Sequence, residues 1–295
     1  MTQSVLILGA NGRFGRHCAT AFEQADWVTH RYDRSSGDLD TAARGMDVIV
    51  NGWNPPYTDW ARDVPRLTAR VIEVAKNNAA TVVIPGNVYV FGPEAPPVLD
   101  ATTPHRATNP LGRIRVELEA AYRASGVQTI LLRAGDFLDT APSGNWFDKI
   151  IAAKAATGKT VAPGDVHAPH AWAYLPDLAR ATVALAEQRT ALAQYEDIPF
   201  PGYTLSLTEL AALISRASGR SQKVKPMAWW PLTAASLVWP MGRKLREMRY
   251  LWSMPHRLDD ARFNALLPAF HPTDPLTAVR SAIAHLDIQP DQPVA

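Results

Sequence analysis

Cysteine is almost absent from this sequence, because Cys18 is the single cysteine in 295 residues. One cysteine excludes an internal disulfide and a cysteine-based zinc site. Long apolar runs are also missing, and no stretch approaches the roughly 20 residues that a membrane-spanning helix needs. Excess charge of one sign is missing too, since 30 basic residues nearly balance 28 acidic ones. We therefore expect no membrane span and no nucleic-acid partner.

The chain begins MTQSVLILG, without a basic leader or a cleavage site. Together with the lone cysteine, this beginning predicts a reduced, cytoplasmic protein. The length, with 47% hydrophobic residues, predicts one large domain with a smaller lobe and a sizeable core.

Short β-branched runs alternate with helix-length segments in the first half of the chain. These runs are SVLIL, WVTHRY, DVIV, TVVI and TILL. Such alternation predicts a Rossmann-like α/β fold, a doubly wound parallel sheet with helices on both faces. Only about a dozen residues separate WVTHRY from DVIV, too few for both an extra strand and a full crossover helix. We therefore expect one strand-helix unit to be trimmed there.

Helical patterns dominate beyond Arg133, in NWFDKIIAAKAATGK, PDLARATVALAEQ, SLTELAALISRASGR and a Trp-rich run over 227–252. This change predicts a dinucleotide-binding core over 1–135 and a mostly helical substrate or lid lobe over 136–295, with 160–190 returning to the core. The proline-containing end, DIQPDQPVA, is typical of a loose terminus. A lobe above the strand ends would form a cleft against the sheet.

Three glycines, Gly9, Gly12 and Gly15, lie between the first strand and the following helix in VLILGANGRFGRH. Glycines at such a corner let the backbone turn sharply and approach a pyrophosphate, while the helix N-terminus directs free N–H groups at it. A tight structural turn is the alternative. The position between a strand and a helix favours a dinucleotide site.

The G-x-x-G-x-x-G spacing resembles the extended or atypical branch of the short-chain dehydrogenase/reductase superfamily. Three further segments are similar to motifs of that branch: GDLDTAARGMDVIVNGW, YLPDLARA and LDDARFNALLPAF. The resemblance implies an epimerase/dehydratase-like protein that binds NAD or NADP and a small-molecule substrate, and it implies a homodimer as a further expectation. The expected cofactor-binding residues are Gly9, Asn11, Gly12, Arg13, Phe14, Gly15, Asp33, Arg34, Asp38, Leu39, Asn51, Gly52, Trp53, Pro85, Gly86 and Arg115.

The identity of the nicotinamide cofactor depends on two neighbouring residues. Asp33 follows Gly15 by 18 residues, near the spacing at which a carboxylate binds the ribose hydroxyls and repels a 2′-phosphate. Arg34 could instead pair with that phosphate. We expect NAD, with NADP as the alternative.

In the family, a Tyr-x-x-x-Lys pair in a segment like PYGxSKxxxE supplies the proton and holds the ribose. The matching segment here, PLGRIRVELE, has Leu111 at the tyrosine position and Arg115 at the lysine position. The usual proton donor is therefore missing. The family serine that polarises the substrate is replaced by Asn87 in PGNVYVFG, and an amide can donate a hydrogen bond to a developing oxyanion.

Three other side chains are candidates for handling the proton. Tyr89 lies two residues after Asn87, although a half-buried structural aromatic is an equal alternative. Asp136 stands where the family often has a substrate-contacting asparagine, just after a strand. His170 stands where nucleotide-sugar enzymes of this branch have a diphosphate-binding arginine, and it can act as acid or base or be structural. Without that arginine, a nucleotide-diphosphate substrate is not expected.

Other patterns point less directly to function. His167 and His170 have no further ligand at metal spacing, so no metal site is expected. Cys18 falls within the first helix and is expected to pack as a small apolar residue. The segment MAWWPLTAASLVWP is interpreted as a lid or core helix. Its alternatives are tryptophans that line the cleft for an apolar or aromatic small molecule, and docking of this helix on a membrane surface. GRKLREMR is interpreted as a solvated basic face, with contact to anionic lipid or to a partner as the alternative.

Two functional hypotheses follow. The first is an NAD(P)-dependent oxidoreductase or epimerase-like enzyme acting on a small non-nucleotide carbonyl or alcohol, with Asn87 polarising the oxygen and Tyr89, Asp136 or His170 exchanging the proton. The second is a non-catalytic protein whose lobes report nicotinamide occupancy to a partner, because the family tyrosine is replaced.

Overall fold

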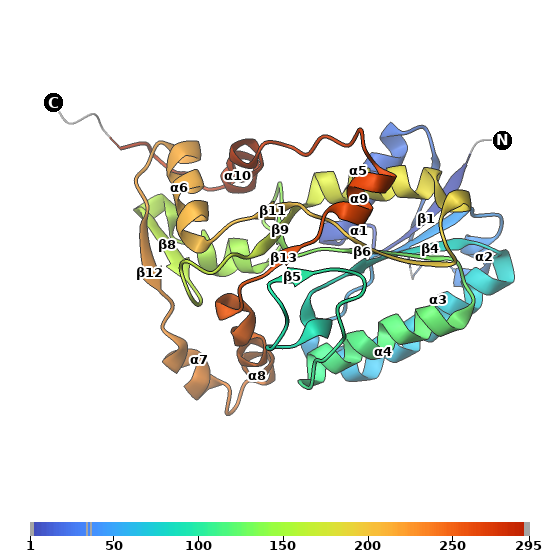
Figure 1. Ribbon diagram of the computed structural model, residues 1–295, viewed down its shortest axis with the longest axis horizontal. Coiled ribbons are helices and arrows are strands. Elements are labelled where there is room, and N and C mark those ends of the chain that lie inside the picture. The colour runs from blue at the N-terminus through green and yellow to red at the C-terminus, as the bar shows by residue number, and fades with distance from the viewer. Residues whose placement is uncertain (1–2, 34, 36, 292–295) are drawn as a thin grey trace.

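The computed structural model describes residues 3–33, 35 and 37–291, and its centre is a six-stranded parallel sheet (Figure 1). The strands are β1 (Ser4–Leu8), β2 (Val28–Tyr32), β3 (Val48–Asn51), β4 (Thr81–Gly86), β6 (Thr129–Arg133) and β10 (Tyr195–Pro199). Their order is β10-β6-β4-β3-β1-β2, and every neighbouring pair is parallel. The predicted Rossmann-like fold is confirmed.

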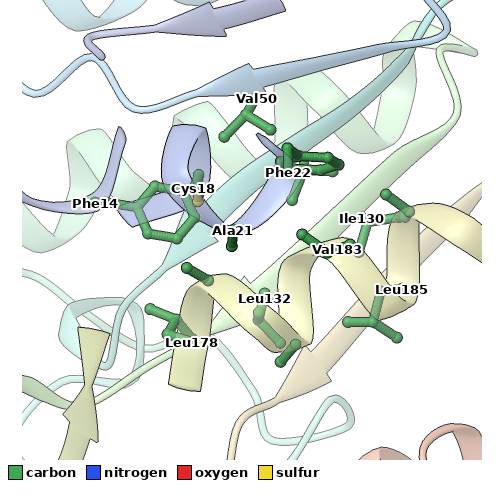
Figure 2. Close-up of a cluster of buried hydrophobic side chains, with 14 of the residues drawn as sticks. Phe14, Cys18, Ala21, Phe22, Val50, Ile130, Leu132, Leu178, Val183 and Leu185 are labelled. Atoms are coloured by element: carbon green, nitrogen blue, oxygen red, sulfur yellow. The ribbon is translucent and has the colours of Figure 1, made fainter. Parts of the chain in front are cut away.

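Helices cover both faces of the sheet, as parallel crossovers require. One face is covered by α1 (Arg13–Gln24) and α5 (Leu175–Glu187), which pack against each other. Figure 2 shows their apolar side chains, among them Phe14, Cys18 and Phe22, packed toward Ile130 and Leu132 of β6. The other face is covered by α2 (Leu39–Ala43), α3 (Trp60–Asn78) and α4 (Pro110–Ser125).

The expected short link after the second strand is present. β2 is the edge strand of the sheet, and the chain passes from it to β3 through the five-residue helix α2. β1 therefore has β2 on one side and β3 on the other. The chain adds β2 on one side of β1 and every later strand of the sheet on the opposite side. In open α/β sheets, ligands bind at such a switch point, outside the carboxyl ends of the strands.

The second lobe, on the left of Figure 1, mixes helices with short strands. Its strands are β7 (Asp136–Leu138), β8 (Lys159–Ala162), β9 (Ala171–Tyr174), β11 (Tyr203–Thr204) and β12 (Lys223–Pro226). Its helices are α6 (Leu207–Ser218), α7 (Trp229–Ala235), α8 (Pro240–Glu247) and α10 (Pro275–Ile283). Near its border with the sheet lie β5 (Val98–Leu99), β13 (Arg257–Leu258) and α9 (Ala261–Leu266).

Two local expectations differ from the structure. The helix expected over 145–159 is wrong: this segment forms a short π-helical turn, Phe147–Ile151, then a 3-10 turn and the start of β8. Its apolar residues pack into the lobe core with Trp172 and Trp252. Their spacing therefore reflects burial in this core and not a regular helix. β10, which returns from the lobe to pair with β6, was not among the predicted strands.

The Trp-rich run over 227–252 forms α7, α8 and a 3-10 turn, Arg249–Ser253, rather than one helix. Trp229 and Trp252 are buried in the lobe core, as a lid or core segment requires. No helix among the described residues is long and apolar enough to cross a membrane. The last four residues of the proline-containing end, 292–295, lie outside the described residues.

Candidate functional site

The glycine-rich corner joins β1 to α1 at the switch point of the sheet. Gly9 has a φ of 74°, a conformation that side chains rarely adopt, and the N–H of Gly12 donates to its carbonyl over 2.8 Å. A Cβ at Gly15 would lie 2.2 Å from the oxygen of Gly9. The corner is therefore as tight as the glycine spacing predicted, with the end of β3 at Gly52 packed directly against it.

The N-terminus of α1 offers hydrogen-bond donors at this corner. Gly12 caps the helix without a side-chain hydrogen bond, and the first turn contains no acidic residue. The first N–H groups of a helix have no partner within it and carry a partial positive charge. Asn11 is exposed beside the corner, Arg13 donates to the carbonyl of Ser143 over 2.9 Å, and Phe14 is buried beneath it. The corner thus has the features of a pyrophosphate site.

Four of the expected cofactor-binding residues follow β2 along the chain. Asp33 is exposed and accepts from the N–H of Ser35 over 2.9 Å, a hydrogen bond that lowers its carboxyl pKa. Arg34 lies outside the described residues. The carboxylate of Asp38 caps α2 and pairs with Arg70 at 3.0 Å, while Leu39 is buried in the core.

The side chain of Asn51 makes two hydrogen bonds at the end of β3. Its amide donates to the hydroxyl of Tyr122 over 3.1 Å, and its oxygen accepts from the N–H of Trp53 over 3.2 Å. The indole of Trp53 lies edge-on to Tyr32, the last residue of β2, with 5.9 Å between the ring centroids. Asn51 therefore shapes the strand end, and the two aromatic rings line the edge of the glycine corner.

Arg115, at the family lysine position, links α4 to the end of β4. Its guanidinium is buried and donates to the carbonyl of Pro85, next to Gly86, over 2.7 Å. It also lies over the ring of Trp60, 5.8 Å from the centroid. Its Nε makes no hydrogen bond within the described residues. This buried donor without a partner is a feature of a ligand site.

Leu111, at the family tyrosine position, is fully buried beneath the C-terminal part of the chain. It packs in one apolar cluster with Met248 and Leu251. Glu247 of α8 accepts from the backbone N–H of Leu111 over 2.5 Å and from the amide of Asn109 over 2.9 Å. No acid-base group can act from the position of Leu111.

A cluster of polar and aromatic side chains lies beside this position. Tyr57, in the turn after β3, hydrogen-bonds through its hydroxyl to that of Tyr89 at 2.7 Å. Burial raises the pKa of both phenols, and the charge of Asp136 raises each further. The charges of Arg13 and Arg115 act on Tyr57 in the opposite direction. Tyr57 therefore lies within electrostatic reach of Arg13 at the glycine corner, Arg115 of α4 and Asp136 of β7.

Asp136 and His170 form the second half of the cluster. Their Oδ2 and Nε2 atoms are 2.7 Å apart, and the imidazole stacks on Trp252 with centroids 4.5 Å apart and rings 4° from parallel. His256 meets His170 edge-on at 4.5 Å. The structure thus brings together three of the four expected catalytic residues: Tyr89, Asp136 and His170.

Asn87, the fourth expected catalytic residue, adjoins the cluster through the backbone. Its side-chain oxygen accepts from the N–H of Tyr89 over 3.0 Å. Because the oxygen is used there, the amide nitrogen remains the group that could donate to a substrate oxygen.

Several residues of this region escaped the sequence analysis. Tyr57 carried one available signal, since it follows a strand that ends at the switch point. His256 and Glu247 reach the site from the C-terminal part of the chain, and no local pattern marks them. Trp252, which also reaches it, is the last residue of the Trp-rich run. Arg133 is fully buried and pairs with Glu119 at 2.8 Å and with Asp197 at 2.5 Å. It also donates to the carbonyl of Asn87, so this ion network supports the loop of the site.

The same network contains the one group of possible metal ligands found among the described residues. Ligand atoms of His105, Glu119 and Asp197 lie within 4.8 Å of one another. However, the guanidinium of Arg133 already binds both carboxylates. The positive charge at this place is therefore supplied by arginine.

Acidification should destabilise the protein through His256. Burial, followed by the nearby His170, lowers the pKa of His256 to about 3. The unfolded histidine titrates near pH 6.5, so stability is complete above that pH and is lost as the pH falls toward 3. At about 1.4 kcal/mol per pH unit, His256 alone should reduce the free energy of unfolding by about 2 kcal/mol between pH 7 and pH 5.

Urea unfolding of the wild type and of His256→Asn at both pH values measures this contribution. Other titrating groups, such as His105, whose pKa is also lowered by burial, act in both proteins and cancel in the comparison. We expect the variant to lose about 2 kcal/mol less than the wild type on acidification. Equal losses in the two proteins would contradict the assignment.

Comparison with known proteins identifies the fold but no close relative. No family model and no curated protein matches the sequence. UDP-glucose 4-epimerase from Brucella ovis in complex with NAD is similar in structure, with a TM-score of 0.73, 18% identity, and coverage of 98% of this chain and 99% of that one. L-threonine dehydrogenase from Phytophthora infestans has a TM-score of 0.72, 20% identity, and coverage of 97% and 99%.

A third similar structure is MoeE5 in complex with UDP-glucose and NAD, with a TM-score of 0.72, 15% identity, and coverage of 96% of this chain and 98% of that one. Each comparison spans both lobes, so the likeness is not restricted to the sheet. The chain therefore shares the overall fold of these epimerase and dehydrogenase structures, in agreement with the fold that its motifs predicted.

Proposed function

We propose that this protein binds a nicotinamide dinucleotide at the glycine-rich corner and catalyses an oxidoreductase or epimerase-like reaction on a small carbonyl or alcohol. The observation that carries the proposal is the Tyr57–Tyr89 hydroxyl pair, 2.7 Å apart, in which Tyr57 is affected by the charges of Arg13, Arg115 and Asp136. The pair provides a proton donor in a site where Leu111 cannot.

The residues present fit the dinucleotide. The helix N-terminus at Gly12 supplies donors for the pyrophosphate, and the partnerless Nε of Arg115 supplies one for the nicotinamide ribose. Asp33 places a negative charge at the end of β2, which attracts ribose hydroxyls and repels a 2′-phosphate. We therefore propose NAD(H) in preference to NADP(H). The bound cofactor would supply the hydride.

Tyr57 would act as the proton donor. A phenol is protonated at neutral pH and can give its proton to an oxygen that becomes negative when hydride arrives. Burial raises the pKa of Tyr57, and the hydrogen bond from Tyr89 and the charges of Arg13 and Arg115 counteract that rise. Tyr89 holds the hydroxyl of Tyr57 in place, and the amide of Asn87 would stabilise the same oxygen. The Asp136–His170 pair, whose carboxylate acts electrostatically on both phenols, would restore the proton.

The surroundings of His170 favour a non-nucleotide substrate. An arginine at this position would offer a permanent cation and two parallel donors to a diphosphate, whereas His170 is buried against Trp252 and paired with Asp136. The similar epimerase was solved with NAD, and MoeE5 with a UDP-sugar as well. In this chain the aromatic rings at the same cluster instead favour a small, partly apolar substrate.

Replacing Tyr57 by phenylalanine tests this assignment. Tyr57→Phe should lower kcat by about a hundredfold or more, because general acid catalysis contributes about 10² to 10⁴. KM should change little, since the ring is kept. The measurement is the change of NADH absorbance in a screen of small aldehydes, ketones and alcohols.

Tyr203→Phe is the matched control. The hydroxyl of Tyr203 donates to the carbonyl of Thr273 over 2.7 Å within the second lobe. This variant should keep the wild-type kcat. A Tyr57→Phe protein with the same kcat as Tyr203→Phe would show that Tyr57 is not the acid.

One observation favours the alternative of a non-catalytic cofactor-binding protein. Leu111 occupies the position of the family tyrosine and packs against the C-terminal lobe, and its backbone N–H donates to Glu247 of that lobe. Such a contact links the catalytic helix to the lobe and could report occupancy. A protein of this kind would bind NADH in calorimetry yet turn over no compound in the screen, and Tyr57→Phe would leave its binding unchanged.

The homodimer implied by the resemblance stays a prediction.

A further inference from the structure

Large apolar side chains are exposed on one small part of the molecule. Among the described residues, five large hydrophobic side chains are exposed, and four of them lie within residues 230–239. These four are Trp230 at 75%, Leu237 at 79%, Val238 at 88% and Trp239 at 46% exposure. They belong to α7, the following turn and the start of α8, at the lower left of Figure 1, away from the parallel sheet. We call residues 229–249 the hairpin.

The hairpin is anchored firmly to the lobe. The indole of Trp229 is buried and donates to the carbonyl of Pro163 over 2.8 Å. Arg246 of α8 donates to the hydroxyl of Ser236 over 2.8 Å, which joins α8 to the end of α7. Glu247 holds the other end against α4. The apolar tip is therefore presented by a fixed structure, and a patch of this kind marks an interaction surface.

The sequence that contains the tip is predominantly basic. Residues 220–257 include eight basic residues and one acidic residue, so the rest of the chain has 22 basic and 27 acidic residues. Of the basic groups, Lys223, Lys225 and Arg243 are exposed and belong to none of the ion pairs among the described residues. The one acidic residue, Glu247, already accepts hydrogen bonds from α4. The segment that carries the apolar tip is thus net positive, on a molecule that is otherwise net negative.

We propose that the hairpin docks on a membrane surface that contains anionic lipid. Tryptophan rings settle at the headgroup level, and leucine and valine side chains enter the acyl boundary. The basic residues around the tip would bind the lipid phosphates, each strengthening binding about fivefold at the surface of an anionic leaflet. The net negative charge of the remaining chain would orient the hairpin toward the bilayer.

The positive charge of the exposed basic residues favours an anionic lipid surface over a second copy of the chain as the binding partner. A self-interface through the hairpin would bring two sets of unpaired basic residues together, which is unfavourable. An anionic lipid surface neutralises them. Docking at this surface is independent of the proposed chemistry, because none of the four exposed side chains belongs to the cofactor or proton-transfer residues.

Sedimentation of the full chain with vesicles tests the proposal. The wild type should sediment with vesicles of phosphatidylcholine and phosphatidylglycerol at low salt, less at high salt, and little with phosphatidylcholine alone. Val238→Asp, at the most exposed position, should weaken binding about tenfold or more, because it places a negative charge in the apolar tip. Arg243→Glu should do the same through charge alone.

Val28→Asp is the matched control, because Val28 is the exposed large hydrophobic residue outside the hairpin, at 46% exposure. It should bind vesicles like the wild type, and thermal unfolding of each variant confirms that it is folded. The proposal is overturned if the wild type fails to bind anionic vesicles, or if Val238→Asp and Val28→Asp bind alike. It is also overturned if light scattering shows a wild-type dimer that Val238→Asp converts to monomer, since the hairpin would then join two copies.

Discussion

Replacing Gly15 by alanine is expected to abolish measurable binding of NADH and to destabilise the fold. The new Cβ would lie 2.2 Å from the carbonyl oxygen of Gly9 and 2.7 Å from its carbon, and neither backbone atom can rotate away. The start of α1 must therefore move relative to β1. Two hydrogen bonds to a charged pyrophosphate, each contributing about 2 kcal/mol, would be lost, which corresponds to roughly a thousandfold weaker binding. We expect the free energy of unfolding to fall by about 2 to 3 kcal/mol.

Gly45→Ala separates the loss of binding from simple backbone strain. Gly45 has the same φ as Gly9, 74°, but nothing lies within 4 Å of its missing Cβ. This variant should lose about 1 kcal/mol of stability and keep its affinity for NADH. Calorimetry and urea unfolding of the three proteins give both quantities. Tight NADH binding by a folded Gly15→Ala protein would show that the pyrophosphate does not bind at this corner, and would contradict the proposed function.

Replacing Arg133 by methionine is expected to cost about 3 to 5 kcal/mol of unfolding free energy. Arg133 is fully buried, and its charge is the partner of two buried carboxylates, Glu119 and Asp197. Those carboxylates raise the pKa of Arg133 in spite of burial, which opposes the charge. Methionine keeps much of the volume but leaves two negative charges without a cation. The loop at Asn87 would also lose the donor that holds its carbonyl.

Arg262→Met is the control for this variant. Arg262 also pairs with a carboxylate, Glu196, at 2.6 Å, but its side chain is 46% exposed. Its loss should cost less than about 1 kcal/mol. Urea unfolding of the wild type and of both variants at pH 7 measures the two losses. Equal unfolding free energies for the two variants at pH 7 would show that the network contributes no more than a surface pair.

The parallel sheet was predictable because its signals are local. Runs such as SVLIL and TILL coincide with β1 and with most of β6, since strands buried on both faces are apolar at every position. β10 was missed because two consecutive acids, Glu196 and Asp197, stand in the middle of YEDIP. They pair with Arg262 and Arg133. Only the pairing with distant arginines allows a buried strand to contain two acids.

Helical periodicity misled at 145–159 for a similar reason. Its Phe, Ile and Ala residues are spaced as in an amphipathic helix, yet they pack around Trp172 and Trp252 through short turns and a strand. Asp148 accepts from the backbone N–H groups of Ser143 and Gly144, which favours the turn at its start. Tertiary packing thus overrides local propensity in this segment.

The candidate site likewise has parts that local sequence predicted and parts that only tertiary packing shows. The amino-acid order alone determined the glycine corner, the position of Arg115 and the absence of the family tyrosine, because these depend on spacing within one strand-helix unit. The three-dimensional packing alone decided that Tyr57 meets Tyr89, that Asp136 meets His170, and that the C-terminal segment seals Leu111. Residues far apart along the chain come together only when the whole core excludes water around them, and no local pattern encodes those encounters.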